Sequence, residues 1–215
     1  ARGGANNYSG GAGGLGGAGS VINVLSTAAT VVGGNVSTTS GTSIVLAANG
    51  TWTLNVTGSP NLASNISGAG NLTQSGSGVL TLAGANTYTG TTTVDNGAVN
   101  ISGSLNVGNS GTANVVMADG TTFAAANITA GLTNISGSGN ITLAGVKGSS
   151  AVTANTTGNL TLSAKLSSGG NVTLVAGSQG ASGLPTGTDT AGDVLTTNGA
   201  QISLPNAGTF TAYTG

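Results

Sequence analysis

The chain has almost none of the side chains that carry out protein chemistry. Its 215 residues include no cysteine and no histidine, with three basic and four acidic side chains in all. Charged residues make up 3% of the chain, against about 25% in an average soluble domain. Without cysteine there are no disulfides, thiolate nucleophiles or thiolate metal sites. We therefore expect no catalytic site, no metal site and no cofactor.

Basic patches and long apolar runs are missing as well. The net charge of −1 offers no cluster of lysine and arginine to neutralise phosphates, so nucleic acid is excluded as a partner. Hydrophobic residues reach 37% but occur singly or in short groups. No run approaches the roughly 18 to 20 apolar residues of a membrane helix, so we expect no transmembrane helix. Because the chain begins at Ala1 without methionine or an apolar signal region, we expect a processed or trimmed product.

What the chain does contain is a short pattern with apolar residues at every second position. Examples are "GVLTLAG" (78–84), "GNITLAG" (139–145) and "GNVTLVAG" (170–177). A period of two predicts strands with one buried face. Threonine, valine, isoleucine and leucine favour strands, while glycine and asparagine at the ends suggest turns with positive φ. We expect very little helix.

The strand segments are also copies of one another. "NISGAGNLTQSG" (65–76) returns as "NISGSGNITLAG" (134–145), and a Gly-Asn-aliphatic-Thr tetrad begins at Gly70, Gly139, Gly158 and Gly170. One such strand buries too few side chains to offset a backbone entropy cost of roughly 1–2 kcal/mol per residue. Stacked coils merge these small apolar rows into one core. The sequence therefore predicts an all-β fold, a parallel β-helix (β-solenoid) over residues 21–215.

Residues 1–20 differ from the rest in composition. This segment, "ARGGANNYSGGAGGLGGAGS", is rich in glycine and has only Leu15 as a sizeable aliphatic side chain. We interpret it as an extended N-terminal tail that lies on another surface, such as that of a neighbouring subunit. The predicted division is thus a tail over 1–20 and a β-helix over 21–215.

One stretch of the β-helix segment matches a known pattern. Residues 68–99, "GAGNLTQSGSGVLTLAGANTYTGTTTVDNGAV", resemble the passenger-associated repeat of bacterial autotransporters. The positions that carry the resemblance are Gly68, Gly70, Leu72, Thr73, Gly78, Leu80, Thr81, Leu82, Gly84, Asn86, Thr87, Tyr88, Thr89, Gly90, Thr91, Thr92, Val94 and Gly97. The remainder looks more loosely like adhesins of the filamentous haemagglutinin kind. These resemblances imply a right-handed parallel β-helix at the bacterial outer surface.

Few residues are candidates for chemistry or ligand binding. Asp189 and Asp193 are the only acids close in sequence, and we interpret them, like Asp95, as turn residues rather than catalysts. Aromatic rings can stack on sugars, but Trp52 alternates with Leu54 and Val56, which predicts core packing. The three tyrosines, Tyr8, Tyr88 and Tyr213, are the other aromatic candidates. We expect Tyr88, within the repeat, to cap a coil edge.

The scarcity of charge is the strongest functional indication after the repeat. Soluble monomers commonly keep about a quarter to a third of their surface charged and protect open strand edges. Neither protection is visible here. We expect a secreted or cell-surface structural protein of a bacterial filament, with itself as main partner and with glycans or host-cell surfaces as further candidates. The alternatives are the monomeric stalk of an adhesin passenger and, third, a polysaccharide-active enzyme.

Overall fold

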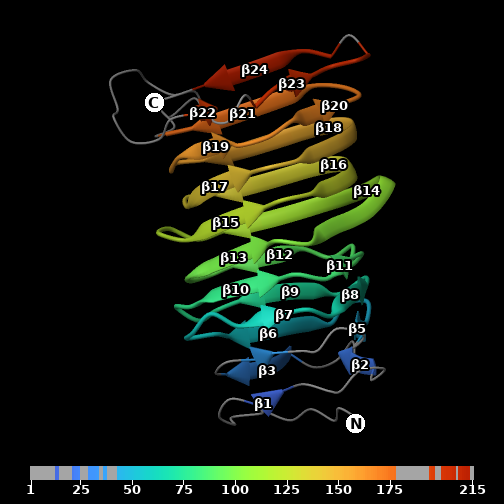
Figure 1. Cartoon of the computed structure of the whole chain (residues 1–215), viewed down its shortest axis with the longest axis vertical. Coiled ribbons are helices and arrows are strands. Elements are labelled where there is room, and N and C mark those ends of the chain that lie inside the picture. Colours follow the sequence, from blue (N-terminus) through green and yellow to red (C-terminus); the bar gives the residue numbers. More distant parts are fainter. Residues whose placement is uncertain are drawn as a thin grey trace.

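The computed structural model describes residues 43–177, 200–206 and 208–213 in full, together with short strands at 13–14, 21–24, 29–33, 36–37 and 194–196. The described elements are strands, and all of their pairings are parallel. The strands stack as the rungs of a β-solenoid of about seven turns, with the C-terminal strands at one end (Figure 1). The predicted all-β parallel β-helix is confirmed; its right-handedness stays a prediction.

The strands form three stacks, which we call faces C, B and A in the order in which a coil passes through them. Face A is a seven-stranded sheet of β7 (Asn61–Leu62), β10 (Val79–Leu82), β13 (Ala98–Ile101), β15 (Thr122–Ala125), β17 (Asn140–Leu143), β19 (Leu160–Leu162) and β22 (Val194–Thr196). Face B holds β3 (Ala29–Gly33), β6 (Thr51–Asn55), β9 (Asn71–Gln74), β12 (Thr92–Val94), β21 (Val172–Ala176) and β24 (Phe210–Tyr213). Face C holds β2 (Val21–Val24), β5 (Ser43–Leu46), β8 (Asn65–Gly68), β11 (Ala85–Asn86), β20 (Leu166–Ser168) and β23 (Ile202–Ser203).

Three long strands join face C to face B around the corner between them. They are β14 (Ser104–Met117), β16 (Ile128–Gly137) and β18 (Val146–Thr156). Their first residues stack on face C and their last residues on face B, which is why a single twelve-stranded sheet spans both faces. Near the N-terminus, β1 (Gly13–Gly14) pairs with β4 (Val36–Ser37). Within residues 1–20 the structure describes Gly13–Gly14 alone. The predicted boundary at residue 21, between the tail and the β-helix, therefore stays a prediction.

The predicted alternation of buried and outward residues holds along the short strands. In β9, β13 and β15, every second side chain is buried and the others are partly exposed. The buried positions of successive coils lie directly above one another. On face A, for example, Leu82 is in register with Leu62 below it and with Ile101 above it, and all three are fully buried. The core is therefore a set of aliphatic columns parallel to the solenoid axis.

Coil length varies, and this explains the uneven spacing of the repeat copies. Leu82 and Ile101 are 19 residues apart in register, whereas the next coil, from Ile101 to Ala125, takes 24. The tetrads at Gly70 and Gly170 precede strands of face B. The two tetrads between them, at residues 139 and 158, precede strands of face A. One local sequence therefore serves at two different corners of the solenoid.

Candidate functional site

The autotransporter-like motif forms one full coil and its corners. Its aliphatic positions lie inside the strands and its glycines lie between strands or at strand ends. The motif positions are Gly68, Gly70, Leu72, Gly78, Leu80, Leu82, Gly84, Asn86, Tyr88, Gly90, Val94 and Gly97. Every aliphatic member of this set is fully buried. The motif is therefore a scaffold that shapes the coil.

The corner glycines are required for close approach between coils. A Cβ atom on Gly90 would lie 2.1 Å from the carbonyl oxygen of Gly70 in the coil below, and one on Gly70 would lie 2.5 Å from the carbonyl oxygen of Ala47. Neither glycine has a positive φ, so the expectation of left-handed turns is wrong for them. That expectation holds at Gly68 and Gly97, where φ is +101° and +66°. Stacking distance, more than turn geometry, selects glycine at the tetrad corner.

Asparagines at the corners continue the ladder of hydrogen bonds where the backbone bends. The Oδ1 atom of Asn71 accepts a hydrogen bond from the backbone N–H of Thr91 in the next coil, at 2.9 Å. Asn140 does the same for the N–H of Asn159, also at 2.9 Å. The sequence reasoning missed this role, although the recurring asparagine of the tetrad was its signal.

Asn86 is a polar residue inside the core. Its side chain is fully buried, and Oδ1 accepts a hydrogen bond of 3.1 Å from the N–H of Ile66 in the coil below. Its Nδ2 group donates to the carbonyl oxygens of Gly84, at 3.0 Å, and of Ser104 in the coil above, at 3.1 Å. A buried amide with all of these bonds satisfied links three successive coils.

Tyr88 is also inside the solenoid, so the expectation that it caps a coil edge is wrong. Its ring is fully buried, and its hydroxyl shares a hydrogen bond of 2.6 Å with Oγ1 of Thr92. Burial raises the pKa of Tyr88 to about 12, and the bond to Thr92 acts in the opposite direction. Trp52 is 1% exposed, which confirms that it packs in the core.

The candidate acids do not form a site in the described part of the chain. Asp95 is an exposed bend residue after β12, as predicted, and Asp119 lies in the turn after β14. Asp189 and Asp193 lie outside the described residues, as does Tyr8. The described residues hold no group of three acids able to bind a metal ion. They also include no helix long and apolar enough to cross a membrane.

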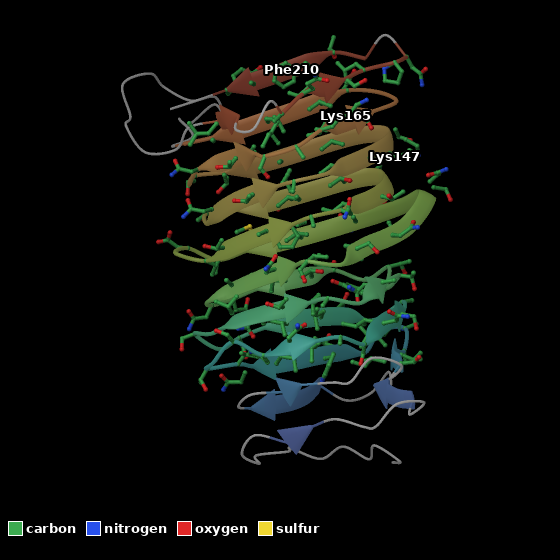
Figure 2. All side chains as sticks on the ribbon, viewed as in Figure 1. Lys147, Lys165 and Phe210 are labelled. Carbon is green, nitrogen blue, oxygen red and sulfur yellow. The ribbon has the colours of Figure 1, made fainter. Side chains whose placement is uncertain are left out.

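Strand β24 is the last strand that the structure describes. In the described structure β24 pairs with β21 on one side only. Its Phe210 continues an inward column formed by Thr133, Val152 and Val172, all of which are buried. Phe210 itself is 47% exposed, at the end of the rod (Figure 2). Phe210 is therefore the last member of this column among the described residues.

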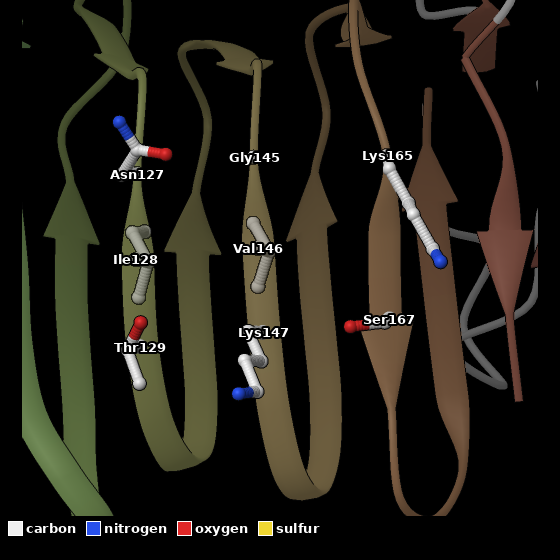
Figure 3. A pocket seen from close by; sticks show the side chains of 8 residues that line it. All are labelled: Asn127, Ile128, Thr129, Gly145, Val146, Lys147, Lys165 and Ser167. Carbon is white, nitrogen blue, oxygen red and sulfur yellow. The ribbon is translucent and has the colours of Figure 1, made fainter. Parts of the chain in front are cut away.

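A hollow of about 260 Å³ lies on face C, across three neighbouring coils. Its lining residues are Asn127, Ile128, Thr129, Gly145, Val146, Lys147, Lys165 and Ser167 (Figure 3). They come from β16, β18 and β20 and the corner residues just before these strands. Both lysine side chains are exposed.

Comparison with known proteins finds one family model that matches part of this coil. Residues 72–101 match the model of the passenger-associated-transport-repeat. The matched segment covers β9 to β13, and the parallel β-solenoid fits such a repeat. No curated protein and no solved structure matches the chain.

Proposed function

We propose that this passenger-like β-helix is an extracellular structural protein, a subunit or segment of a bacterial surface fibre. The passenger-associated repeat points to a structural or adhesin-type β-helix and to a secreted or surface location, rather than to an enzyme. The outer walls support the same proposal, because threonine, asparagine and serine dominate them and charge is scarce. Such neutral walls do not keep copies apart by repulsion.

One observation carries the filament proposal: within the described structure, β24 has a partner strand on one side only. A strand edge presents unpaired backbone groups, which natural proteins usually protect with charge, proline or a covering segment. The segment from Thr209 to Tyr213 has neither charge nor proline. Its inward Phe210 also offers apolar area for a further rung. A second copy of the chain, adding its first coil to β24, buries both the edge and this ring.

The edge can be tested by removing one backbone donor. Parallel ladders bond every second residue to a given neighbour, and the carbonyl oxygen of Thr209 accepts from Val172 of β21. Ala212 therefore directs its N–H away from β21. We expect Ala212→Pro to abolish filaments seen by negative-stain electron microscopy, because proline removes that donor and leaves the bonds to β21 intact.

Ala212→Ser is the matched control, since it changes the same side chain and keeps the N–H. Its filaments should equal those of the unaltered chain. Circular dichroism must show the same β signal for both variants. Filaments of unchanged length in Ala212→Pro would refute growth through this edge.

The N-terminal tail provides a second test of the same proposal. Gly13–Gly14 pairs with β4 of its own chain, so the test concerns the other residues of the tail. If these lie on a neighbouring subunit, deletion of residues 1–20 should abolish filaments and leave the β-type circular dichroism unchanged. Persistence of filaments after the deletion would show that the tail has no part in assembly.

The second candidate function is a monomeric stalk of an adhesin passenger, which the repeat match also favours. Size-exclusion chromatography with electron microscopy separates the two, because a stalk gives rods of one fixed length and a polymer gives fibres of indefinite length. An enzyme is the third candidate. Activity on a polysaccharide panel that is lost in Asp189→Ala or Asp193→Ala would favour it over both.

A further inference from the structure

The hollow on face C collects the positive charge of the described chain. Lys147 and Lys165 are its two described cations, and they lie on adjacent coils, since Lys147 of β18 is in register with Ser167 of β20. The described acids, Asp95 and Asp119, both follow strands of face B, at the corner that leads to face A. No carboxylate therefore neutralises the lysines within the described structure.

The shape of the hollow follows from a missing side chain. Gly145 immediately precedes Val146, in register with Asn127 below and Lys165 above at the same corner. Glycine leaves a gap in this column, and the walls are Asn127 on one side and Lys165 on the other (Figure 3). A Cβ on Gly145 would lie 3.3 Å from Oδ1 of Asn127, which shows how closely that wall approaches.

The two ammonium groups do not meet each other. In Figure 3, Lys147 leans toward β16 and Lys165 leans away from it. Each ammonium stands on a flexible four-carbon stem, so either is able to turn over the hollow when an anion is present. Lys147 and Lys165 lie on neighbouring coils, whose strands are about 4.8 Å apart, and are two residues out of register, so one negative group between them is attracted to both ammonium groups.

The other polar walls are neutral. Asn127, Thr129 and Ser167 supply an amide and two hydroxyl groups, and no hydrogen bond ties these side chains to other described residues. Such groups both donate to and accept from alcohols. The volume of about 260 Å³ suits one ring rather than a drug-sized ligand, for which pockets of about 300–1,000 Å³ are usual.

We propose that the hollow on face C binds one acidic sugar unit of a polysaccharide. The lysines Lys147 and Lys165 hold its carboxylate, and Asn127, Thr129 and Ser167 bond its ring hydroxyls. The hollow opens on the side of the rod, so a long polysaccharide is able to cross the wall without entering the core. This gives a filament or stalk a means of attachment to an acidic glycan coat.

The probe for the test is a trigalacturonate, titrated into the full-length chain by isothermal titration calorimetry at 0.05 M and 0.5 M salt. We expect binding at low salt and much weaker binding at high salt, because exposed charges are screened. Lys147→Gln and Lys165→Gln should each weaken binding by about tenfold, the usual loss for a hydrogen bond to a charged group. The fully methyl-esterified trisaccharide, which has no carboxylate charge, should not bind.

Two controls separate a built site from general charge attraction. The first moves both charges to face B, by adding Thr153→Lys and Thr173→Lys to the double glutamine variant; these threonines are partly exposed and in register on neighbouring coils. The second replaces the probe by inorganic sulfate. Equal binding by the relocated variant, equal binding of the ester, or equal affinity for sulfate would each overturn the proposal. Unchanged urea denaturation of the variants verifies that they are folded.

Discussion

At the scale of single residues, the interior of the solenoid contains polar side chains that hold coils in place. Asn86 bonds to the coils below and above it. Gln74 donates from Nε2 to the carbonyl oxygens of Gly76, at 2.9 Å, and Gly78, at 3.2 Å, and so fixes the turn after β9. Both side chains are fully buried. The Asn86 amide discriminates between registers, since a slipped coil leaves it without its partners in the neighbouring coils.

Tyr88 makes the folded chain sensitive to alkaline pH. Its pKa is about 12 in the folded state and close to 10 when unfolded. Folding therefore favours the neutral form of the phenol. Its contribution to the free energy of unfolding is complete below pH 10 and is lost as the pH rises from 10 through 12. We expect the stability advantage over Tyr88→Phe, measured by urea denaturation, to shrink by about 1.4 kcal/mol between pH 8 and pH 11.

Tyr213→Phe, at a half-exposed tyrosine, is the control for general effects of alkali. Its free energy of unfolding relative to the unaltered chain is measured at the same two pH values. A constant difference between the unaltered chain and Tyr88→Phe at both pH values would contradict burial of the phenol.

At the scale of the element, the corner between faces C and B determines how closely coils stack. Because a Cβ on Gly90 would lie 2.1 Å from backbone oxygen, Gly90→Ala must push two coils apart or bend the corner. We expect a loss of about 1–3 kcal/mol, as for an overpacked core. Thermal unfolding followed by circular dichroism should show this as a melting temperature several degrees lower.

Gly120→Asn is the companion variant. Gly120 has a φ of +71° and nothing within 4 Å of its Cβ position, and asparagine tolerates this conformation. Its stability should stay within about 0.5 kcal/mol of the unaltered chain. Similar losses in both variants would mean that the contact between coils is not what selects glycine at residue 90.

At the scale of the whole molecule, stability is distributed along a stack in which each coil touches its neighbours. Strand β15 is paired on both sides, by β13 and β17, whereas β24 is paired on one side in the described structure. We expect amide hydrogens of β15 to exchange much more slowly than those of Phe210 and Ala212 in β24. Hydrogen exchange measured on unassembled protein tests this gradient, and uniform protection along the rod would contradict it.

The sequence by itself determined the strands, their buried positions and the stacked architecture. Alternation of apolar residues assigns Leu80 and Leu82 to the inside, because side chains of a strand point to opposite faces in turn. Each repeated segment is too short to form a core that offsets the backbone entropy lost when it is ordered. Stacking of the coils was therefore expected, because it merges their apolar side chains into one core. The inward position of Trp52 came from the same alternation.

Only the tertiary structure decided which residues meet across coils. Coils of 18 to 38 residues, as between Ala125 and Leu143 and between Val172 and Phe210, give no constant period from which register could be read. The buried links of Asn86, the positions of Lys147 and Lys165 on adjacent coils, and the exposed ring of Phe210 all depend on that register. The register between neighbouring coils determines which distant residues come into contact, and this register is set by the backbone pairing of the stacked strands.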